Sequence, residues 1–247
     1  MNKNKQYKEH KTWIGGKHSV LHALKNEKNT IYNIALSSKK NLNLIPKHLL
    51  GLVKIKSLKE IDSLFKIEIN HQGFSAEINA LKTLSSPDLE KNIEKYKNVI
   101  LLNNVFDDRN IGSIIRSCVA FNIKCLIIEK DNFRSNSQLM YKTASGGMEH
   151  IDIYLVTNLN NTIKVLKKNN FWTYSLDGEG DKNIFDLDLN TKSAFIFGSE
   201  GQGIQHLIKK NSDEIVSIPI NKKIESLNLS NSVAIVLSLI KKSPLNN

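Results

Sequence analysis

Cysteine is scarce in this sequence. Only Cys118 and Cys125 occur among the 247 residues, and both lie among apolar neighbours. A disulfide framework needs several cysteine pairs, and a structural zinc site needs clustered cysteines and histidines, so neither is expected. The seven histidines are scattered, and the pair His18 and His22 has no third ligand nearby. We therefore expect reduced thiols, as in a cytoplasmic protein, and no metal.

Long apolar runs and the common nucleotide motifs are also missing. No segment approaches the roughly 18 apolar residues of a membrane span, and no apolar segment follows the basic residues 1–11, so a secretory signal is not expected. Gly198–Gly203 has the spacing GxxGxG, which is not a dinucleotide fingerprint, and Gly15–Lys17 does not complete a Walker loop. There is no nucleophile elbow and no convincing triad.

Arginine is the third scarcity, with 3 arginines against 32 lysines. In so lysine-rich a chain, an arginine is expected where its planar, permanently charged fork matters. Arg109, Arg116 and Arg134 are the three, and Arg116 is the only charged residue between Ile111 and Phe121. A lone arginine on an apolar helix has a plainer interpretation, an ion pair with a neighbouring acid.

The positive charge is concentrated in the first part of the chain. The net charge is +11, and residues 1–98 carry 18 Lys against 9 acids, whereas residues 99–247 carry 17 Lys and Arg against 15 acids. This asymmetry favours a polyanionic partner, RNA or DNA rather than a membrane. The alternative is a well-solvated lysine surface without a partner.

Apolar and polar periodicity predicts an α/β protein in two parts. The pattern in residues 1–82 predicts a small α/β domain, in which we expect helices at Leu42–Leu50 and Leu58–Phe65. Residues 83–97 are polar and contain Pro87, so they are expected to be a linker. Residues 98–247 alternate strands and helices and end in an expected helix over Asn228–Lys242, which predicts a parallel sheet.

A ligand site is predicted within residues 195–231. A buried strand ends at the glycine-rich Gly198–Gly203, and a second apolar run leads to a polar loop before the last helix; ligands bind at such strand ends in open α/β sheets. Glu200 argues against a phosphate there. Each polar candidate also has a structural interpretation: Glu200 as a cap of a helix near Ile204, Asn110 as the cap of the helix at 111–122, and Asn228 as the cap of the final helix.

Three segments resemble the motifs of the SpoU-type RNA ribose 2′-O-methyltransferases, within the SPOUT superfamily. They match in order over about 150 residues and span 104–117, 196–203 and 218–230. Residues 15–23 and His71–Gly73 also resemble the substrate-binding domain of the subgroup that acts on guanosine of 23S ribosomal RNA. One departure is Asp108, where the family commonly has proline.

The resemblance implies a deep trefoil knot in the C-terminal domain, S-adenosylmethionine as methyl donor, a homodimer, and an N-terminal RNA-binding domain of the L30e type. It implies ribosomal RNA as the substrate. The alternatives are a tRNA enzyme of the same family and a catalytically inactive RNA-binding protein. The site residues that it implies are catalytic Arg116, Asn110, Glu200, Ser226 and Asn228, and cofactor-binding Gly198, Ser199, Gly203, Ile218 and Leu227.

Arg116 is the residue on which the implied chemistry depends most. A guanidinium with a pKa above about 12 is a poor base. We therefore expect Arg116 to bind the phosphate of the target nucleotide and to orient the ribose hydroxyl, while phosphate or water accepts the proton.

Overall fold

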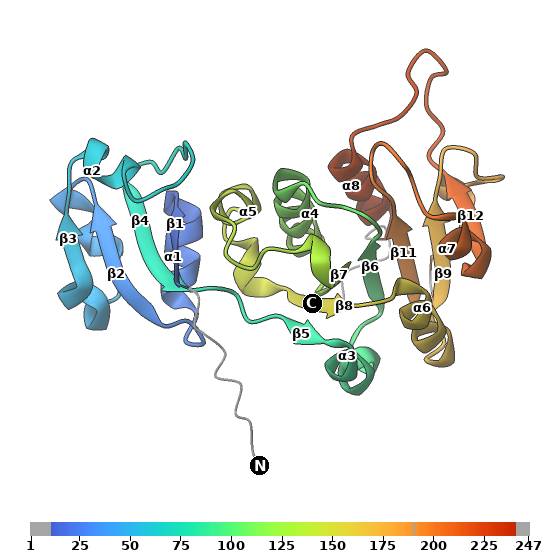
Figure 1. Cartoon of the computed structure of the whole chain (residues 1–247), viewed down its shortest axis with the longest axis horizontal. Coiled ribbons are helices and arrows are strands. Elements are labelled where there is room, and N and C mark those ends of the chain that lie inside the picture. The colour runs from blue at the N-terminus through green and yellow to red at the C-terminus, as the bar shows by residue number, and fades with distance from the viewer. Residues whose placement is uncertain (1–10, 190, 241–247) are drawn as a thin grey trace. The chain divides into compact units, whose positions relative to one another are not determined.

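The computed structural model describes residues 11–189 and 191–240, and these form two compact units (Figure 1). Unit 1 contains residues 11–82 together with residues 134–149. Unit 2 contains residues 83–133 and the chain from residue 150 onward. Among the described helices, none is long and apolar enough to cross a membrane.

Unit 1 is built on a sheet with the order β1-β4-β2-β3. β4 runs antiparallel to both β1 and β2, and β2 runs parallel to β3. The helices α1 and α2 complete this part of the unit, and Ser57 and Glu60 form a capping box at the start of α2. The bounds are β1 Lys11–Gly15, α1 Lys17–Lys25, β2 Ile31–Leu36, β3 Val53–Ile55, α2 Leu58–Asp62 and β4 Phe74–Asn79.

The prediction of one helix at Leu42–Leu50 is wrong. The chain instead forms two short 3₁₀ segments, Lys39–Leu44 and Lys47–Leu52, on either side of Pro46. Proline disfavours helical backbone in the residue before it and lacks an amide donor, so one continuous helix cannot pass this point. The second expected helix begins at Leu58 as predicted but ends at Asp62, shorter than expected.

The segment 134–149 belongs to unit 1 although it lies between two strands of unit 2 in the sequence. Its helix α5 (Gln138–Ala144) contacts β1 and α1. The phenol oxygen of Tyr141 accepts a hydrogen bond from the backbone amide of Leu81 at 2.9 Å. Glu149 Oε2 accepts hydrogen bonds from Asn26 Nδ2 at 2.6 Å and Asn29 Nδ2 at 2.8 Å. Unit 1 is therefore assembled from two separate stretches of chain.

Unit 2 is organised around a parallel sheet, as the sequence predicts. Within the described residues the strand order is β10-β12-β9-β11-β6-β7-β8-β5, and every pairing is parallel. The bounds are β5 Leu84–Ser85, α3 Ser86–Asn92, β6 Asn98–Leu102, α4 Asp108–Ala120, β7 Cys125–Glu129, β8 Asp152–Val156, α6 Leu159–Lys168, β9 Trp172–Leu176, β10 Lys182–Asn183, β11 Ser193–Phe197, α7 His206–Asn211, β12 Glu214–Ser217 and α8 Leu229–Ile240.

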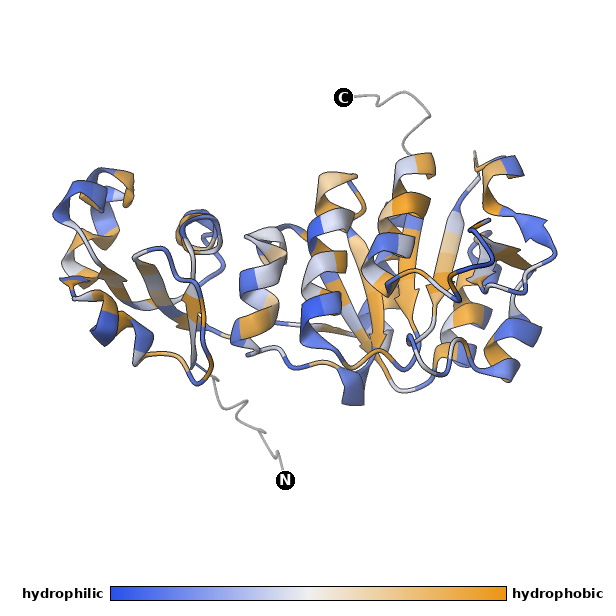
Figure 2. Ribbon diagram, turned by 90° about the horizontal axis from the view of Figure 1, so that it is seen from above, coloured by the Kyte–Doolittle hydropathy of each residue, from blue (hydrophilic) through white to orange (hydrophobic). Residues whose placement is uncertain are grey.

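Both faces of this sheet are covered, which explains why its central strands are apolar throughout. Val99, Leu101, Ala194 and Ile196 belong to one buried cluster with residues of α3, α6 and α7. Alternate residues point to the opposite face, which α4 and α8 cover in mutual contact (Figure 1). The strands are accordingly orange in the hydropathy colouring of Figure 2.

The stretch 83–97 is structured and lies in unit 2. It forms β5, α3 and a 3₁₀ turn, and it buries Leu89, Ile93 and Tyr96. Pro87, which suggested a connection, lies in the first turn of α3, where a missing amide donor costs nothing. A short apolar stripe on an otherwise polar segment is therefore enough to join this stretch to the sheet. The helix expected to reach Lys242 is described to Ile240, and the two lysines after it lie outside the described residues.

Glu149→Ala should lower the free energy of unfolding by about 2 kcal/mol, because two side-chain amides lose a charged acceptor. Chemical denaturation monitored by circular dichroism measures this change. Glu90→Ala is the matched control, since Glu90 is exposed and accepts no hydrogen bond within the described part of the chain. Equal stabilities of the two variants would contradict the role of Glu149 in unit 1.

Candidate functional site

One cavity lies at the carboxyl ends of β9, β11 and β12 in unit 2. Its volume is about 590 Å³, within the usual range for a small-molecule site. All five residues expected to bind a cofactor line it, and so do Glu200 and Ser226. These lining residues are Gly198, Ser199, Glu200, Gly203, Ile218, Ser226 and Leu227.

The glycine-rich loop forms one wall of this cavity and is closed on itself. Ser199 and Gly203 form an isolated bridge, with the Gly203 amide donating to the Ser199 carbonyl at 2.9 Å. A Cβ added to Gly198 would come within 2.1 Å of the Gly203 carbonyl carbon, so no larger residue fits there. Gly203 itself has φ of 63°, a left-handed conformation that favours glycine. The wall next to the cavity is therefore largely bare backbone.

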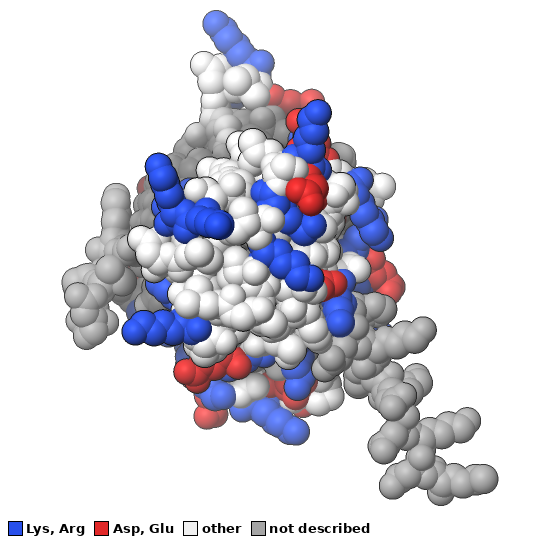
Figure 3. Space-filling model, turned by 90° about the vertical axis from the view of Figure 1, so that its left-hand side faces the viewer, with Lys and Arg blue, Asp and Glu red and all other residues white. Residues whose placement is uncertain are grey.

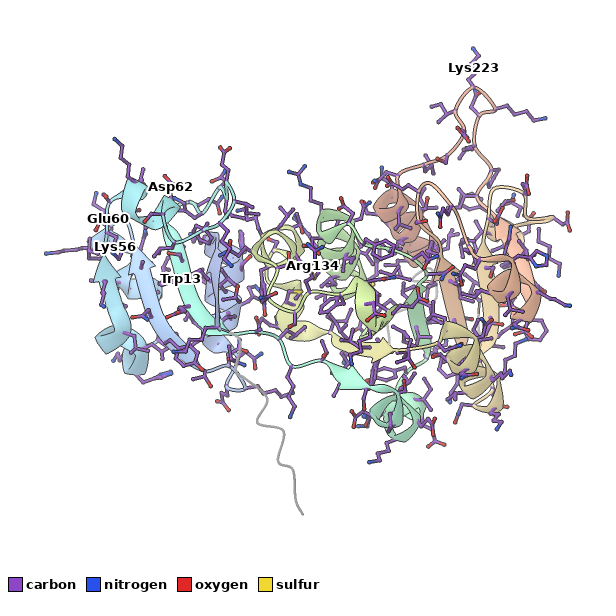
Figure 4. All side chains as sticks on the ribbon, in the orientation of Figure 1. Trp13, Lys56, Glu60, Asp62, Arg134 and Lys223 are labelled. Carbon is purple, nitrogen blue, oxygen red and sulfur yellow. The ribbon has the colours of Figure 1, made fainter. Side chains whose placement is uncertain are left out.

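The loop from Ile218 to Asn228 forms the opposite wall. Ile218, Ile220 and Leu227 supply apolar surface to the cavity. The backbone of Leu227 makes no hydrogen bond to another described residue, so its amide and carbonyl remain for a ligand. At the tip of this loop, Lys223 points outward into solvent (Figure 4).

Glu200 joins three distant segments of the chain. Its Oε1 accepts hydrogen bonds from Asn110 Nδ2 at 3.1 Å, from Asn228 Nδ2 at 2.6 Å and from the Leu229 backbone amide at 3.2 Å. Asn228 Nδ2 also donates to Asn110 Oδ1 at 3.1 Å. The expectation that Glu200 caps the helix after the glycine loop is wrong, because it caps the start of α8 instead. One carboxylate thus holds three of the expected site residues together.

Asn110 is not the cap of α4. Asp107 is, and its Oδ1 accepts from the backbone amides of Arg109 and Asn110 at 2.8 Å each. Asn110 lies in the first turn, where its amide side chain reaches Glu200. Asp108, which stands where the family that the motifs resemble commonly has proline, is the first residue of this helix. A negative charge at this position suits the helix dipole. The departure therefore does not loosen the start of α4.

Asn228 caps α8 and also contacts Glu200, and Ser226 stands apart. Asn228 Oδ1 accepts from the Ser230 amide at 3.0 Å, as a cap of α8, while its Nδ2 turns to Glu200. Ser226 is exposed and lines the cavity without entering the amide cluster. Its hydroxyl makes no hydrogen bond to another described residue, so it remains available to a ligand.

Arg116 is not brought to this cluster. It follows Asn110 by six residues on α4, which separates the two by about 9 Å along the axis and by about a third of a turn around it. Its side chain is exposed and forms no hydrogen bond or ion pair within the described residues. The plain interpretation of a lone arginine, an ion pair with a neighbouring acid, is therefore wrong within this part of the chain.

Sequence reasoning missed Asp177, which follows β9 and also lines the cavity. Lys209 Nζ donates to Asp177 Oδ2 at 2.9 Å, and the Glu179 amide donates to Oδ1 at 3.0 Å. Burial raises the pKa of this carboxyl, but the two hydrogen bonds and the lysine charge together hold the pKa below its ordinary value. The signal was present in the polar run Asp177–Gly180 directly after a predicted strand.

Metal and thiol chemistry find no support here. Among the described residues, no three His, Cys, Asp or Glu side chains are grouped to hold a metal. Burial raises the pKa of the Cys118 thiol to about 12, which leaves the unreactive protonated form at neutral pH. What the site offers is backbone, amide and hydroxyl groups, the carboxylates of Asp177, Glu200 and Glu225, and the amine of Lys222. This arrangement is suited to holding and orienting ligands.

Family models match both parts of the chain. The model described as "SpoU rRNA Methylase family" matches residues 97–238, and the model "RNA 2'-O ribose methyltransferase substrate binding" matches residues 13–84. An "Uncharacterized tRNA/rRNA methyltransferase" of Borreliella burgdorferi is 34% identical over 193 residues, 74% of this chain and 84% of the relative. A "23S rRNA (guanosine-2'-O-)-methyltransferase RlmB" of Xanthomonas campestris pv. campestris is 31% identical over 173 residues, 69% of this chain and 70% of the relative.

Solved structures with the same fold include an AdoMet-bound rRNA methyltransferase from Sinorhizobium meliloti. It has a TM-score of 0.79 at 16% identity and covers 96% of this chain and 88% of its own. The SpoU methyltransferase AviRb from Streptomyces viridochromogenes, in complex with AdoMet, has a TM-score of 0.73 at 16% identity, with coverages of 97% and 92%. At these identities the likeness concerns the fold.

Asn110→Asp should lower methyl transfer to RNA at least about 100-fold, because a second carboxylate would face Glu200 and drive the start of α4 from its position. Steady-state incorporation of labelled methyl groups from S-adenosylmethionine measures this loss. Asn136→Asp is the control, an exposed residue whose side chain makes no hydrogen bond to a described residue. Similar rates for both variants would refute the importance of the amide–carboxylate cluster.

Proposed function

Because the chain belongs to the SpoU rRNA methylase family, we propose that it methylates the ribose 2′-hydroxyl of a guanosine in 23S ribosomal RNA. Membership makes the chain an S-adenosylmethionine-dependent RNA methyltransferase. The observation that supports the positioning of a ribose hydroxyl is the cluster of Asn110, Glu200 and Asn228 beside the cavity of unit 2. Relatives named for guanosine methylation of 23S rRNA, at 28–31% identity, support this substrate.

The cavity fits S-adenosylmethionine in size and in chemistry. Its walls combine apolar side chains with backbone that glycine leaves uncovered. The residues that would hold the cofactor are Gly198, Ser199, Gly203, Ile218 and Leu227. When bound, the cofactor supplies a methyl group that its positive sulfur has already activated. The protein's own task is therefore to place a ribose hydroxyl in line with that methyl group and to dispose of one proton.

The amide cluster positions the RNA. Glu200 keeps Asn110 and Asn228 in fixed orientations, and Oε2 of Glu200 accepts no hydrogen bond from a described residue. Ser226 adds a free hydroxyl on the side of the cavity. These groups are polar and neutral or negative, so they suit hydroxyl and base-edge donors of the nucleotide. They provide no positive charge for its phosphate.

Arg116 supplies that charge from a second copy of the chain. On its own chain it lies about 9 Å along α4 from Asn110 and projects into solvent. A homodimer that pairs the α4 surfaces brings each exposed guanidinium toward the other copy's cavity. There Arg116 binds the target phosphate and orients the 2′-hydroxyl, and phosphate or water accepts the proton, since a guanidinium does not give up its own.

Unit 1 grips the RNA as a substrate-binding domain of the L30e type. The family model for substrate binding over residues 13–84 supports this assignment. Exposed lysines gather along residues 39–59, and the surface that faces the viewer in Figure 3 carries many more basic than acidic side chains. Such a surface attracts the RNA backbone without regard to sequence. These exposed lysines are Lys39, Lys40, Lys47, Lys54 and Lys59.

We further propose that the C-terminal part of unit 2 forms a trefoil knot. The chain leaves β11 for β12 on the far side of β9 and then returns to place α8 against α4, as the strand order and contacts support. The knot would tie the glycine-rich loop and the loop 218–228 into one cofactor cradle. Action on ribosomal RNA assigns the enzyme to the cytoplasm.

The purified protein should transfer labelled methyl groups from S-adenosylmethionine to 23S rRNA fragments and not to tRNA. Loss of one 2′-O-methylguanosine from 23S rRNA in cells without the gene identifies the nucleotide. Methylation of tRNA alone would replace the ribosomal substrate by transfer RNA. A folded protein that methylates neither RNA would point to a binding function.

Arg116→Lys should lower the rate at least about tenfold, because an ammonium cannot reproduce the planar two-pronged contact with phosphate. Mixed dimers test the contribution in trans. Arg116→Ala and Glu200→Ala homodimers should each be nearly inactive, whereas mixing them should restore activity at one of the two sites in each heterodimer. Full activity of Arg116→Lys, or failure of the mixture to recover, would count against this arrangement.

A further inference from the structure

A buried polar network lies next to the glycine-rich loop and shares no residue with the amide cluster. Asn103, directly after β6, is fully buried, and its side chain bonds in two directions. Its Oδ1 accepts from the backbone amide of Gln205 at 3.0 Å, and its Nδ2 donates to Glu129 Oε2 at 3.3 Å. The backbone amide of Asn103 donates to the Phe197 carbonyl at 2.8 Å. Asn103 thus ties the end of β6 to both ends of the glycine-rich loop.

Glu129, the last residue of β7, is the acceptor that completes this network. The same Oε2 accepts from the Asn104 backbone amide at 2.9 Å and from Asn132 Nδ2 at 3.3 Å. Asn104 has φ of 55°, a left-handed conformation that costs free energy. Such a conformation persists only where the surrounding structure imposes it. The carboxylate of Glu129 compensates for it by taking the Asn104 amide as a donor.

Two chain segments that carry candidate site residues begin at this network. The left-handed turn at Asn104 sends the chain to Asp107, which caps α4 and sets Asn110 in place. In the other direction, Gln205 follows the glycine-rich loop that carries Glu200. Asn110 and Glu200 then meet at 3.1 Å. The two groups are therefore aligned by a common buried anchor.

The arrangement of donors and acceptors in the network determines how the Asn103 side-chain amide is oriented. A carboxylate can only accept hydrogen bonds, so Glu129 requires the amino end of the Asn103 amide. The carbonyl end must then face Gln205, whose backbone amide can only donate. A buried amide in the opposite orientation would set donor against donor and leave polar atoms unpaired, at substantial cost.

We propose that Asn103 and Glu129 are positioning residues for methyl transfer, which act by fixing the relative placement of Asn110 and Glu200. Neither residue lines the cavity, and neither belongs to the amide cluster. Their effect is on the rate of methyl transfer more than on cofactor affinity, because the walls of the cavity are also held by β9, β11 and the loop 218–228. The inference rests on the methyltransferase activity of the chain, whatever RNA is its substrate.

The test changes charge at the two positions. Asn103→Asp keeps the acceptor for Gln205 but faces Glu129 with a second carboxylate. Glu129→Gln keeps an oxygen for the donors of Asn103, Asn104 and Asn132 but removes its charge. In the double variant, the amide at position 129 keeps an oxygen for the Asn104 amide, and the repulsion between two carboxylates is gone. The placement of the two segments is then recovered in part.

We expect Asn103→Asp to lower kcat at least tenfold, with the Kd of S-adenosylmethionine measured by calorimetry changed less than threefold. Glu129→Gln should lower kcat by a smaller factor, and the double variant should raise kcat at least threefold above that of Asn103→Asp. A kcat for Asn103→Asp within threefold of wild type would overturn the proposal, as would a double variant that regains thermal stability without regaining kcat.

Thr173→Val separates positioning from general destabilisation. Thr173 is also fully buried, and its hydroxyl donates to Asp213 Oδ2 at 2.6 Å near the start of β9, at the strand end away from the cavity. This variant should lower the unfolding temperature in the same way but keep kcat within twofold. A parallel loss of kcat in Thr173→Val would attribute the effect to stability. Inactive wild-type protein on every RNA would instead refute the assigned activity.

Discussion

The candidate site depends on one carboxylate oxygen that accepts hydrogen bonds from three donors. Oε1 of Glu200 accepts from a residue of the first motif, from a residue of the third motif, and from the first amide of α8. Hydrogen bonds to a charged acceptor are the stronger kind, and here they close a triangle across segments about 90 and 28 positions away in the sequence. The rest of unit 2 holds the three strand ends and helix starts near enough for this triangle to form.

Much of the fold could be predicted from local pattern. The apolar strands β6, β7 and β11 and the amphipathic α4 have clear periodicity, and their alternation predicts a parallel sheet. The predictions of secondary structure that were wrong also have local causes. Pro46 divides an expected helix into two 3₁₀ turns, and a short buried stripe at Leu89 and Ile93 turns an expected linker into a helix of unit 2. Periodicity over a few residues does not reveal either outcome.

The sequence predicted which residues belong to the candidate site better than it predicted which of them bond to one another. Motif resemblance selected Asn110, Glu200 and Asn228, yet their default interpretation as three separate helix caps hid the fact that they bond to one another. Sequence spacing also groups Arg116 with Asn110, although helix geometry directs the two apart. Asp177 and Asn103 were missed because each is an ordinary polar residue after a strand, and its partner lies far along the chain.

Unit 1 is built from two separate stretches of chain, and this limits how its gene can recombine. Because residues 134–149 belong to unit 1 while the residues on both sides belong to unit 2, the polypeptide passes between the units three times. A recombination event with a single crossover would therefore transplant an incomplete unit, and Glu149 would lose both of its amide partners. Unit 1 can be inherited whole only if two separate stretches of gene change together, which favours gradual divergence over exchange of modules.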